Sequence, residues 1–180
     1  MSEPIVRAST DADIVEITAI YGHHVLHGTA SFETTAPEPG EIAQRRQAVL
    51  ERGLPYLVAE IGGSVAGFAY AGTYRPRPAY RFTVENSVYL RPGQEGRGLG
   101  RALMSDVLRR CEQGPWRQMI AVIGDSSNQA SIRLHEKLGF RHVGVLRSVG
   151  FKFGRWLDTV VMQRPLGAGD ETAPDASYQR

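Results

Sequence analysis

The chain has 180 residues, of which 42% are hydrophobic and 22% charged, and this length and composition are typical of one globular domain. Its 21 Lys and Arg against 19 Asp and Glu give a formal net charge of +2, which is too small to indicate a nucleic-acid partner. The single cysteine, Cys111, excludes an internal disulfide, and Met1-Ser2-Glu3-Pro4 lacks the basic and apolar regions of a secretory signal, so we expect a soluble cytoplasmic protein without membrane contact.

The first elements predicted along the chain are a short strand and two helices. Ile5 and Val6 form the strand, and Thr10 can cap a helix whose apolar residues recur at helical spacing from Ile14 to Val25. A polar loop follows, and a second helix is expected from about Glu41 to Glu51.

A run of strands comes next. Tyr56–Ile61 and Val65–Tyr74 flank Gly62-Gly63, a pattern typical of a β-hairpin. The two prolines of Arg75-Pro76-Arg77-Pro78 exclude a central strand there, and Arg81–Leu90 reads as the next strand.

The second half alternates helices and strands. Leu99 opens an amphipathic helix, Met119–Ile123 is a strand, and Asn128–Leu138 is a helix that Gly139 ends. Two last strands are expected at Phe140–Leu146 and Leu157–Met162. The elements indicate a mixed α/β layout around one sheet, with a domain over residues 1–166 and a disordered tail over 167–180.

The most informative segment is a glycine-rich turn between a strand and a helix. Gly96, Gly98 and Gly100 follow the strand that ends at Leu90, and such a turn points successive N–H groups at a ligand. The helix N-terminus adds its dipole, so the place suits phosphate. The Walker and dinucleotide fingerprints do not fit, because Gly100 is followed by Arg101-Ala102 and the third glycine comes one position too early. A plain loop into a helix is the alternative for this turn taken alone.

A second segment, Asn128-Gln129-Ala130-Ser131 to Gly139-Phe140, accompanies the turn. The pair resembles the GNAT acetyltransferase superfamily, and within it the phosphinothricin and methionine sulfoximine N-acetyltransferase family. Further matching stretches lie at residues 56–60, 67–72, 84–90, 121–124 and 150–156, so the likeness covers about residues 4–166. It implies an α/β (α+β) fold, the GNAT fold, with a mixed, mostly antiparallel sheet of six to seven strands flanked by about four helices.

The resemblance implies an acetyl-CoA-dependent N-acetyltransferase that acts directly on the α-amine of a small amino acid analogue, and a homodimer. No metal is expected. One position departs from the family, because Glu95 stands where Gln or Arg is usual in the glycine motif, and a carboxylate there should weaken cofactor binding. Coenzyme contacts are expected from the strand that ends at Leu90, from the glycine-rich turn with the start of its helix, and from the helix that begins at Asn128. They are Val88, Tyr89, Leu90, Gly96, Arg97, Gly98, Leu99, Gly100, Arg101, Asn128 and Ser131.

Two residues are expected to carry the chemistry. Glu85 corresponds to the family's catalytic glutamate, and it shares a strand face with Ser87 and Tyr89. A carboxylate at its ordinary pKa is a weak base for an ammonium, so the site must raise that pKa or relay the proton through water. His135 matches the family's active-centre histidine and can donate a proton or orient the thioester.

The acceptor side is expected to involve a loop and two arginines. Arg75 and Arg77 can clamp a carboxylate bidentately, although exposed loop arginines are common. Phe32, Glu33 and Lys152 are further candidates for the acceptor pocket.

Alternatives stay open at this point. A related enzyme acting on protein N-termini or polyamines, and a non-catalytic acetyl-CoA sensor, share the same cofactor motif. His23, His24 and His27 lie at helical spacing, but no further ligand pattern accompanies them, so an amphipathic helix is favoured over a metal site. Cys111 reads as a buried structural residue rather than a nucleophile.

Overall fold

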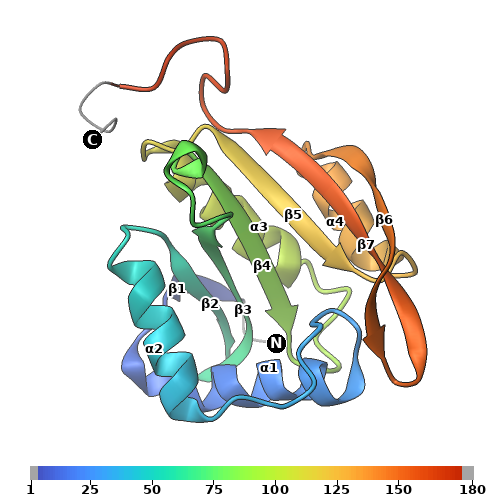
Figure 1. The fold of residues 1–180 in the computed structure, drawn as a ribbon. Helices are drawn as coiled ribbons and strands as arrows, with labels where there is room; N and C mark the ends of the chain where they lie inside the picture. Colours follow the sequence, from blue (N-terminus) through green and yellow to red (C-terminus); the bar gives the residue numbers. More distant parts are fainter. Residues whose placement is uncertain (1–3, 176–180) are drawn as a thin grey trace.

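The computed structural model describes residues 4–175 and contains one seven-stranded sheet with helices on both faces (Figure 1). The strands run in the order β1-β2-β3-β4-β5-β7-β6; β4 and β5 are parallel, and every other neighbouring pair is antiparallel. This confirms the predicted fold class. In chain order the elements are β1 (Ile5–Ala8), the 3₁₀ turn η1 (Asp11–Asp13), α1 (Ile14–His27), α2 (Pro39–Leu50), β2 (Tyr56–Ile61), β3 (Ser64–Thr73), the 3₁₀ turn η2 (Pro78–Tyr80), β4 (Thr83–Leu90), α3 (Leu99–Glu112), β5 (Gln118–Gly124), α4 (Gln129–Lys137), β6 (Arg141–Lys152) and β7 (Arg155–Pro165).

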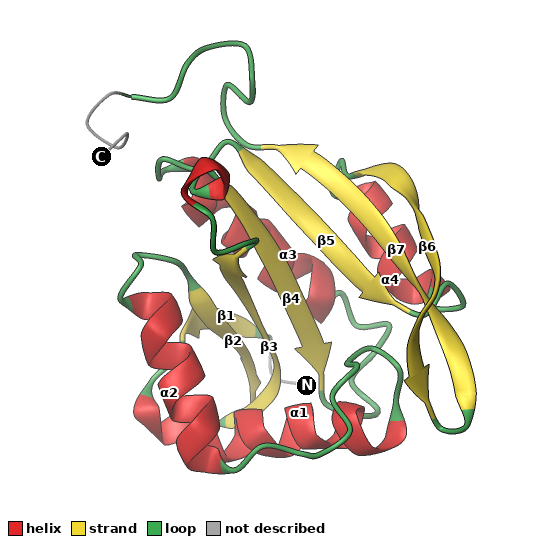
Figure 2. Ribbon diagram, viewed as in Figure 1, coloured by secondary structure: helices red, strands yellow, loops and turns green. Residues whose placement is uncertain are grey.

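Two separate hydrophobic cores lie on the two faces of the sheet. Helices α1 and α2 pack against one face, and α3 and α4 pack against the other (Figure 2). Strand β2 shows how the sequence divides them. Tyr56 and Val58 pack with the residues of α1, whereas Leu57 and Ala59 pack with those of α3. Side chains of a strand alternate between faces, so an unbroken apolar run predicts a strand that is buried on both sides.

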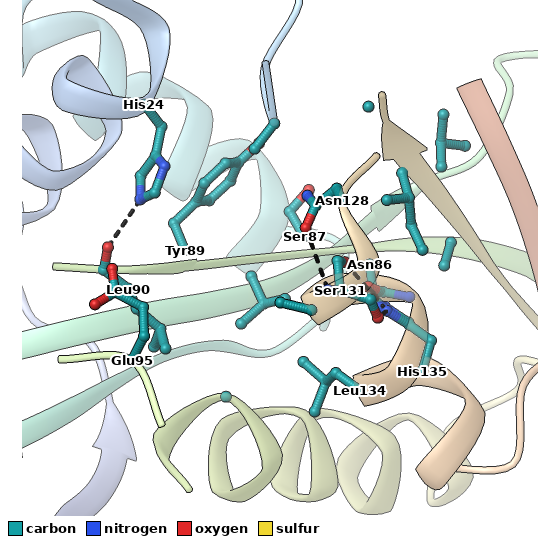
Figure 3. A pocket seen from close by; sticks show the side chains of 18 of the residues that line it. His24, Asn86, Ser87, Tyr89, Leu90, Glu95, Asn128, Ser131, Leu134 and His135 are labelled. Atoms are coloured by element: carbon teal, nitrogen blue, oxygen red, sulfur yellow. Dashed lines mark hydrogen bonds between the residues drawn. The ribbon is translucent and has the colours of Figure 1, made fainter. Parts of the chain in front are cut away.

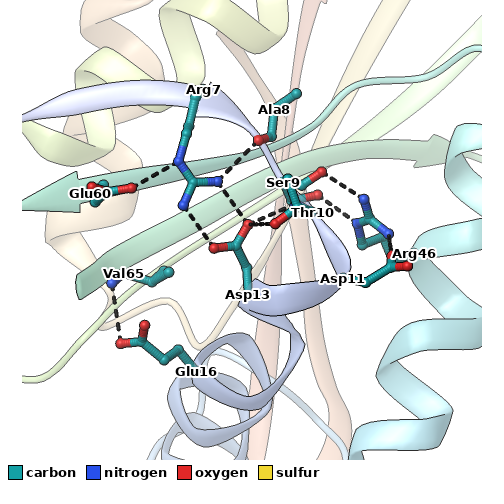
Figure 4. A network of polar contacts seen from close by, with 10 residues as sticks. All are labelled: Arg7, Ala8, Ser9, Thr10, Asp11, Asp13, Glu16, Arg46, Glu60 and Val65. Carbon is teal, nitrogen blue, oxygen red and sulfur yellow. Dashed lines mark hydrogen bonds and ion pairs between the residues drawn. The ribbon is translucent and has the colours of Figure 1, made fainter. Parts of the chain in front are cut away.

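A network of ion pairs fastens the N-terminal strand to both helices of its face (Figure 4). The Arg7 guanidinium donates two 2.8 Å hydrogen bonds to the Asp13 carboxylate and a third to Glu60. These contacts from Arg7 lower the pKa of Asp13 to about 2. On α2, Arg46 donates to the hydroxyl and the carbonyl oxygen of Ser9 at 2.7 and 2.6 Å. The entry into α1 is therefore held from β2 and from α2.

Strands β4 and β5 pair over only part of their length. Thr83 to Asn86 lie beside Gln118 to Ala121, and beyond these pairs the two strands diverge. From Ser87 to Leu90, β4 keeps β3 as its neighbour on one side, and within residues 4–175 it has no strand on the other. The sheet therefore opens at its centre, which is visible in Figure 1 as the gap below the contact of β4 with β5.

The structure differs from the sequence expectations mainly in the last hairpin. β6 ends at Lys152 rather than at Leu146, and β7 runs from Arg155 to Pro165 rather than from Leu157 to Met162. The added residues are mostly exposed and follow a register shift between Leu146 and Gly150, so they carry no alternation of apolar and polar side chains. The turn uses Phe153 and Gly154 at φ +51° and +73°, the positive φ values that tight hairpins need.

The starts of two other elements shift by two residues each. Helix α2 starts at Pro39 rather than Glu41, because proline at the first helical position lacks only an N–H that would have no partner there. Strand β4 starts at Thr83 rather than Arg81, since the turn η2 ends just before it.

The segment that follows β7 is held by Arg117. The Arg117 guanidinium donates to the Thr172 hydroxyl at 2.8 Å and to the Ala173 carbonyl oxygen. Residues 176–180 of the predicted tail lie outside the described residues, and the domain boundary at 166 stays a prediction. No helix within residues 4–175 is long and apolar enough to cross a membrane.

Candidate active site

A cavity of about 290 Å³ fills the opening between the diverging strands β4 and β5 (Figure 3). Its walls come from the unpaired part of β4, the end of β5, the turn before α3 and the first turns of α4. The lining residues are His24, Ala30, Asn86, Ser87, Val88, Tyr89, Leu90, Glu95, Gly96, Gly100, Ala121, Val122, Ile123, Gly124, Asn128, Ala130, Ser131, Leu134 and His135. One wall is thus an exposed strand edge, with backbone N–H and C=O groups that no second strand occupies.

The glycine-rich turn closes one end of this cavity. Gly96 and Gly98 have φ values of +74° and +81°, a region that favours glycine, and a Cβ added at Gly96 would meet nothing within 4 Å. The first helical hydrogen bond of α3 runs from the Ala102 N–H to the Gly98 carbonyl, so the N–H groups before Ala102 have no partner within the helix. The open space above the turn and these donors together suit an anion.

The predicted coenzyme contacts fall into two sets. Those on β4 and α4, together with Gly96 and Gly100, line the cavity. Arg97, Gly98, Leu99 and Arg101 do not line it. Arg97 donates to the Gln94 side chain at 2.7 Å, and Leu99, the first residue of α3, is buried in the core. Asn128 caps α4 by accepting from the Ser131 N–H at 3.2 Å, and it also lines the cavity.

His135 lies in the cavity wall with both ring nitrogens engaged. The side chain is 2% exposed, Nδ1 lies 2.8 Å from the Ser131 carbonyl oxygen, and Nε2 lies 2.9 Å from Asn86 Oδ1. Both oxygens are acceptors, so a neutral ring satisfies one contact at a time, and only the protonated ring would donate to both. Burial opposes that charge and lowers the pKa of His135.

Glu85 lies on the opposite face of β4 from Asn86. It is partly buried, and it shares its face with Ser87 and Tyr89, which both line the cavity. Burial raises the pKa of Glu85, and the nearby charge of Arg75 opposes this rise. Residues two positions apart on a strand are separated by roughly 6.6 Å. Glu85 is therefore about that far from Ser87, and its carboxylate lies beside the cavity rather than within its lining.

The loop between α1 and α2 meets the β6–β7 hairpin at the cavity mouth. The Phe32 ring is 38% exposed and packs against Gly150, where an added Cβ would lie 2.4 Å from its Cε2 atom. Lys152 is 5% exposed, and its ammonium donates to the carbonyl oxygens of Gly28 and Ser31 at 2.8 and 2.7 Å. Lys152 therefore binds the loop between α1 and α2 to the β6–β7 hairpin.

Glu33 joins the same loop to both helices. It accepts from Arg45 at 2.7 and 3.2 Å and from the Tyr21 hydroxyl at 2.8 Å. Burial works to raise the pKa of Glu33, but these hydrogen bonds outweigh it and lower that pKa. The carboxylate is therefore a fixed anion in the loop.

Arg75 and Arg77 lie apart from the cavity between β4 and β5. Both line a second cavity at the beginning of β4. Arg75 remains within electrostatic reach of Glu85 and stacks its guanidinium over the Tyr74 ring at 5.1 Å. Of the two arginines, Arg75 is thus the one whose charge interacts with the predicted base, Glu85.

The sequence did not identify the lining residues His24 and Asn86 as parts of the site. His24 donates from Nε2 to the Leu90 carbonyl at 2.8 Å, which fixes the end of β4. Asn86 replaces an apolar residue on a core-facing position between Val84 and Val88, and this is the one sequence signal that could have identified it. Glu95, the position that departs from the family's glycine motif, lines the cavity (Figure 3), and its side chain is exposed.

The remaining sequence questions concern metals and Cys111. Within residues 4–175 no three His, Cys, Asp or Glu side chains gather in a way that could hold a metal ion. The rings of His23 and His27 pack against each other at 4.9 Å. Cys111 is fully buried, and burial raises the pKa of its thiol to about 12, which makes it a poor nucleophile.

The known proteins that this chain resembles are acetyltransferases. The sequence pattern of the acetyltransferase (GNAT) family matches residues 23–140. The chain is 59% identical over 170 residues to phosphinothricin N-acetyltransferase of Alcaligenes faecalis, covering 94% of this chain and 86% of that protein. It is 42% identical over 174 residues to L-methionine sulfoximine/L-methionine sulfone acetyltransferase of Salmonella typhimurium, covering 95% of this chain and 98% of that protein.

Among solved structures, a phosphinothricin acetyltransferase of the GNAT superfamily from Sinorhizobium meliloti, crystallised with acetyl-CoA, superimposes with a TM-score of 0.94. The two chains are 46% identical, and the match covers 98% of this chain and 95% of that one.

Proposed function

The chain belongs to the acetyltransferase (GNAT) family and is an acetyl-CoA-dependent N-acetyltransferase, and we propose that its acceptor is the α-amine of a small amino acid analogue. Phosphinothricin, methionine sulfoximine and methionine sulfone are the acceptor types we propose, because they are named in the relatives at 59% and 42% identity. The observation that carries the proposal is the cavity between β4 and β5, which joins a free strand edge to a glycine-rich turn.

Acetyl-CoA fits this arrangement in two parts. We propose that the diphosphate binds the N–H groups of the turn around Gly96 to Gly100, where the space is open and the helix dipole favours negative charge. The pantetheine arm then follows β4 from Leu90 toward Ser87, where amide groups can pair with the unoccupied strand edge. A backbone N–H of this edge polarises the thioester carbonyl, and one such donor is typically worth about 3 kcal/mol of the barrier.

Glu85 is the proposed base. The ammonium of the acceptor loses a proton to the Glu85 carboxylate, through a water molecule because the carboxylate stands beside the cavity. The free amine attacks the thioester carbon, the C–N bond forms as the C–S bond breaks, and the coenzyme leaves as a thiolate that takes up a proton. The raised pKa of Glu85 supports this role, because it brings the base closer to the pKa of its substrate.

His135 is proposed to assist by orientation rather than as a free proton donor. Its contacts to Ser131 and Asn86 join α4 to β4 at the cavity wall, so the ring fixes the distance between the two sides of the site. Direct transfer is proposed over an acyl-cysteine intermediate, since Cys111 is buried on the core-facing side of α3 and the pKa of its thiol is raised.

The acceptor carboxylate is proposed to meet Arg75 and Arg77, which approach β4 from the β3–β4 connection. Phe32 and Glu33 are proposed to border the acceptor from the loop after α1, with Lys152 acting through the same loop by holding its carbonyl groups.

A homodimer is proposed, with the β6–β7 hairpin as its interface. Large apolar side chains are exposed along this hairpin, and contiguous exposed apolar surface marks interaction sites. Phe151, Phe153 and Trp156 are 59%, 57% and 64% exposed. Analytical ultracentrifugation tests the state, and a Phe151→Asp variant should shift it to monomer. A cytoplasmic location is proposed as well, because the substrate is acetyl-CoA and the lone cysteine is reduced without a partner.

The test of the function is thiol release from acetyl-CoA with a panel of amines. We expect turnover with phosphinothricin and methionine sulfoximine, and a loss of about 10²–10⁴-fold in kcat for Glu85→Gln, the usual worth of a general base. Glu51→Gln, at an exposed helix end, is the matched control and should keep full activity.

Other outcomes select the alternatives. A higher kcat/KM for peptide N-termini or polyamines would favour the protein or polyamine acetyltransferase. Coenzyme binding without thiol release across the panel would favour a sensor domain. Unchanged turnover in Glu85→Gln would remove that residue from the mechanism.

A further inference from the structure

Asn86 stands at the point where β4 and β5 separate, which is the narrow end of the cavity between them. It forms the last residue pair between the two strands with Ala121, and both residues line the cavity. His135 lines the same end from α4, whereas His24 and Leu90 lie at the opposite end (Figure 3). A ligand that enters between the strands therefore ends against Asn86 and His135.

The Asn86 side chain is held at both ends of its amide group. Nδ2 donates to the Ile120 carbonyl oxygen at 3.3 Å, and Oδ1 accepts from His135 Nε2 at 2.9 Å. A flipped amide would place its oxygen against the Ile120 carbonyl oxygen, so the hydrogen bond to β5 fixes the orientation. The residue is 6% exposed, and turning the side chain aside would leave buried polar groups without partners, which costs free energy.

The His135 ring beside it has little freedom as well. It is almost fully buried, and it packs edge-on against the Phe140 ring with the two centroids 5.0 Å apart. Close-packed side chains of this kind do not yield to an added methylene group without strain. Asn86 and His135 therefore form a stiff floor at the narrow end of the cavity.

The proposed path of the pantetheine arm brings the acyl group of the coenzyme to this floor. The arm runs along β4 from Leu90 toward Ser87, and the acyl group at its end comes next to Asn86. We infer that Asn86 is a specificity-determining residue for the acyl group, and that its fixed side chain restricts transfer to acetyl. A chain that is one or two carbons longer would meet the Asn86 amide. The inference rests on the proposed placement of the coenzyme.

Steady-state kinetics with acetyl-, propionyl- and butyryl-CoA test the inference, with the amine that gives the highest rate of acetyl transfer as acceptor. For the wild type we expect kcat/KM to be roughly 10–200-fold lower with propionyl-CoA than with acetyl-CoA, the usual worth of one methylene in a fitted pocket. It should be lower still with butyryl-CoA. Asn86→Ala removes three heavy atoms from the floor and should reduce the preference for acetyl-CoA about tenfold or more.

Val84→Ala is the matched control. Val84 lies two residues before Asn86 on the same face of β4 and is buried in the core, but it lies outside the cavity lining. Its truncation also removes volume from β4, so it lowers stability without changing the acyl preference. If Asn86→Ala does not fold, Asn86→Ser serves in its place, because it removes less of the side chain and keeps a hydroxyl group. It should shift the preference in the same direction.

Calorimetric titration of the three thioesters without an acceptor separates this inference from the proposed function. The ratio of the dissociation constants of propionyl-CoA and acetyl-CoA should fall in the Asn86 variant and stay at the wild-type value in Val84→Ala. Thioester binding without transfer to any amine would contradict the proposed function, and the ratio of dissociation constants would still test the role of Asn86.

Three results would overturn the inference. They are a wild type that uses butyryl-CoA as efficiently as acetyl-CoA, an acyl preference that is unchanged in the Asn86 variant, and an equal change of preference in Val84→Ala.

Discussion

Replacing Lys152 with methionine tests how the acceptor-side loop is held. The ammonium donates to the Gly28 and Ser31 carbonyl oxygens at 2.8 and 2.7 Å from a side chain that is almost fully buried. Methionine keeps most of the length and apolar volume of lysine, so the substitution removes the two hydrogen bonds with little change in packing.

The size of the effect follows from the burial of the two carbonyls. An unpaired buried acceptor costs about 1–3 kcal/mol, and the Ser31 bond is the more buried of the two, while Gly28 can turn partly to water. Loss of the desolvation penalty of the ammonium offsets a part of this cost. We therefore expect a net loss of about 2 kcal/mol, which in a chain of this length lowers Tm by about 4–8 °C.

Thermal unfolding by circular dichroism and steady-state kinetics measure the two consequences. Because the loop carries Phe32 and Glu33, KM for the acceptor should rise several-fold while the dissociation constant of acetyl-CoA stays the same. Lys137 on α4 is exposed and is the only other lysine of the chain, so Lys137→Met is the matched control and should behave as wild type. A Tm within about 1 °C of wild type with an unchanged acceptor KM would refute the reasoning, because the loop would then be held by other contacts.

Three further predictions concern the site. Arg75→Ala should raise the pKa of Glu85 further, because the Arg75 charge lowers it; the carboxylate is active when deprotonated, so the acidic limb of the kcat/KM profile should move to higher pH. Gly150→Ala should cost about 1–3 kcal/mol in urea unfolding and raise the acceptor KM, since the added methyl overlaps the Phe32 ring, and normal stability would contradict that packing. His135 has a folded-state pKa below its ordinary 6.5, so the unfolded chain binds the proton first; stability should be full above about pH 6.5 and fall as the pH drops below it, and His135→Gln should flatten this slope in urea titrations at pH 7.5 and 5.5.

The sequence predicted the fold well where the apolar pattern reports burial. β2 is apolar along nearly its whole length because both its faces are covered, and Gly62-Gly63 marked the hairpin that follows. The same logic failed at the end of β6, where Val149 and Phe151 are more than half exposed. A strand that leaves the sheet has no core face, so its residues show no period that distinguishes it from a loop.

The site was partly predictable for a different reason. Glycines with positive φ and a helix start leave a local sequence trace, and Gly96 and Gly98 adopt the expected conformation. Contacts between distant segments leave none. The link from His24 to the Leu90 carbonyl spans 66 positions, and the link from Lys152 to Ser31 spans 121. Such pairs depend on the tertiary arrangement, which no window of sequence contains.

The divergence of β4 from β5 has a thermodynamic consequence. Between Ser87 and Leu90 the hydrogen-bond ladder between β4 and β5 is incomplete, and a bound molecule with its own amide groups can supply the missing pairing. Acetyl-CoA would then pair with β4 in the place of a strand. Part of its binding free energy would come from completing this hydrogen-bond ladder. At 100 times its dissociation constant it should raise the free energy of unfolding by about 2.7 kcal/mol, and hydrogen exchange should slow first along this strand edge.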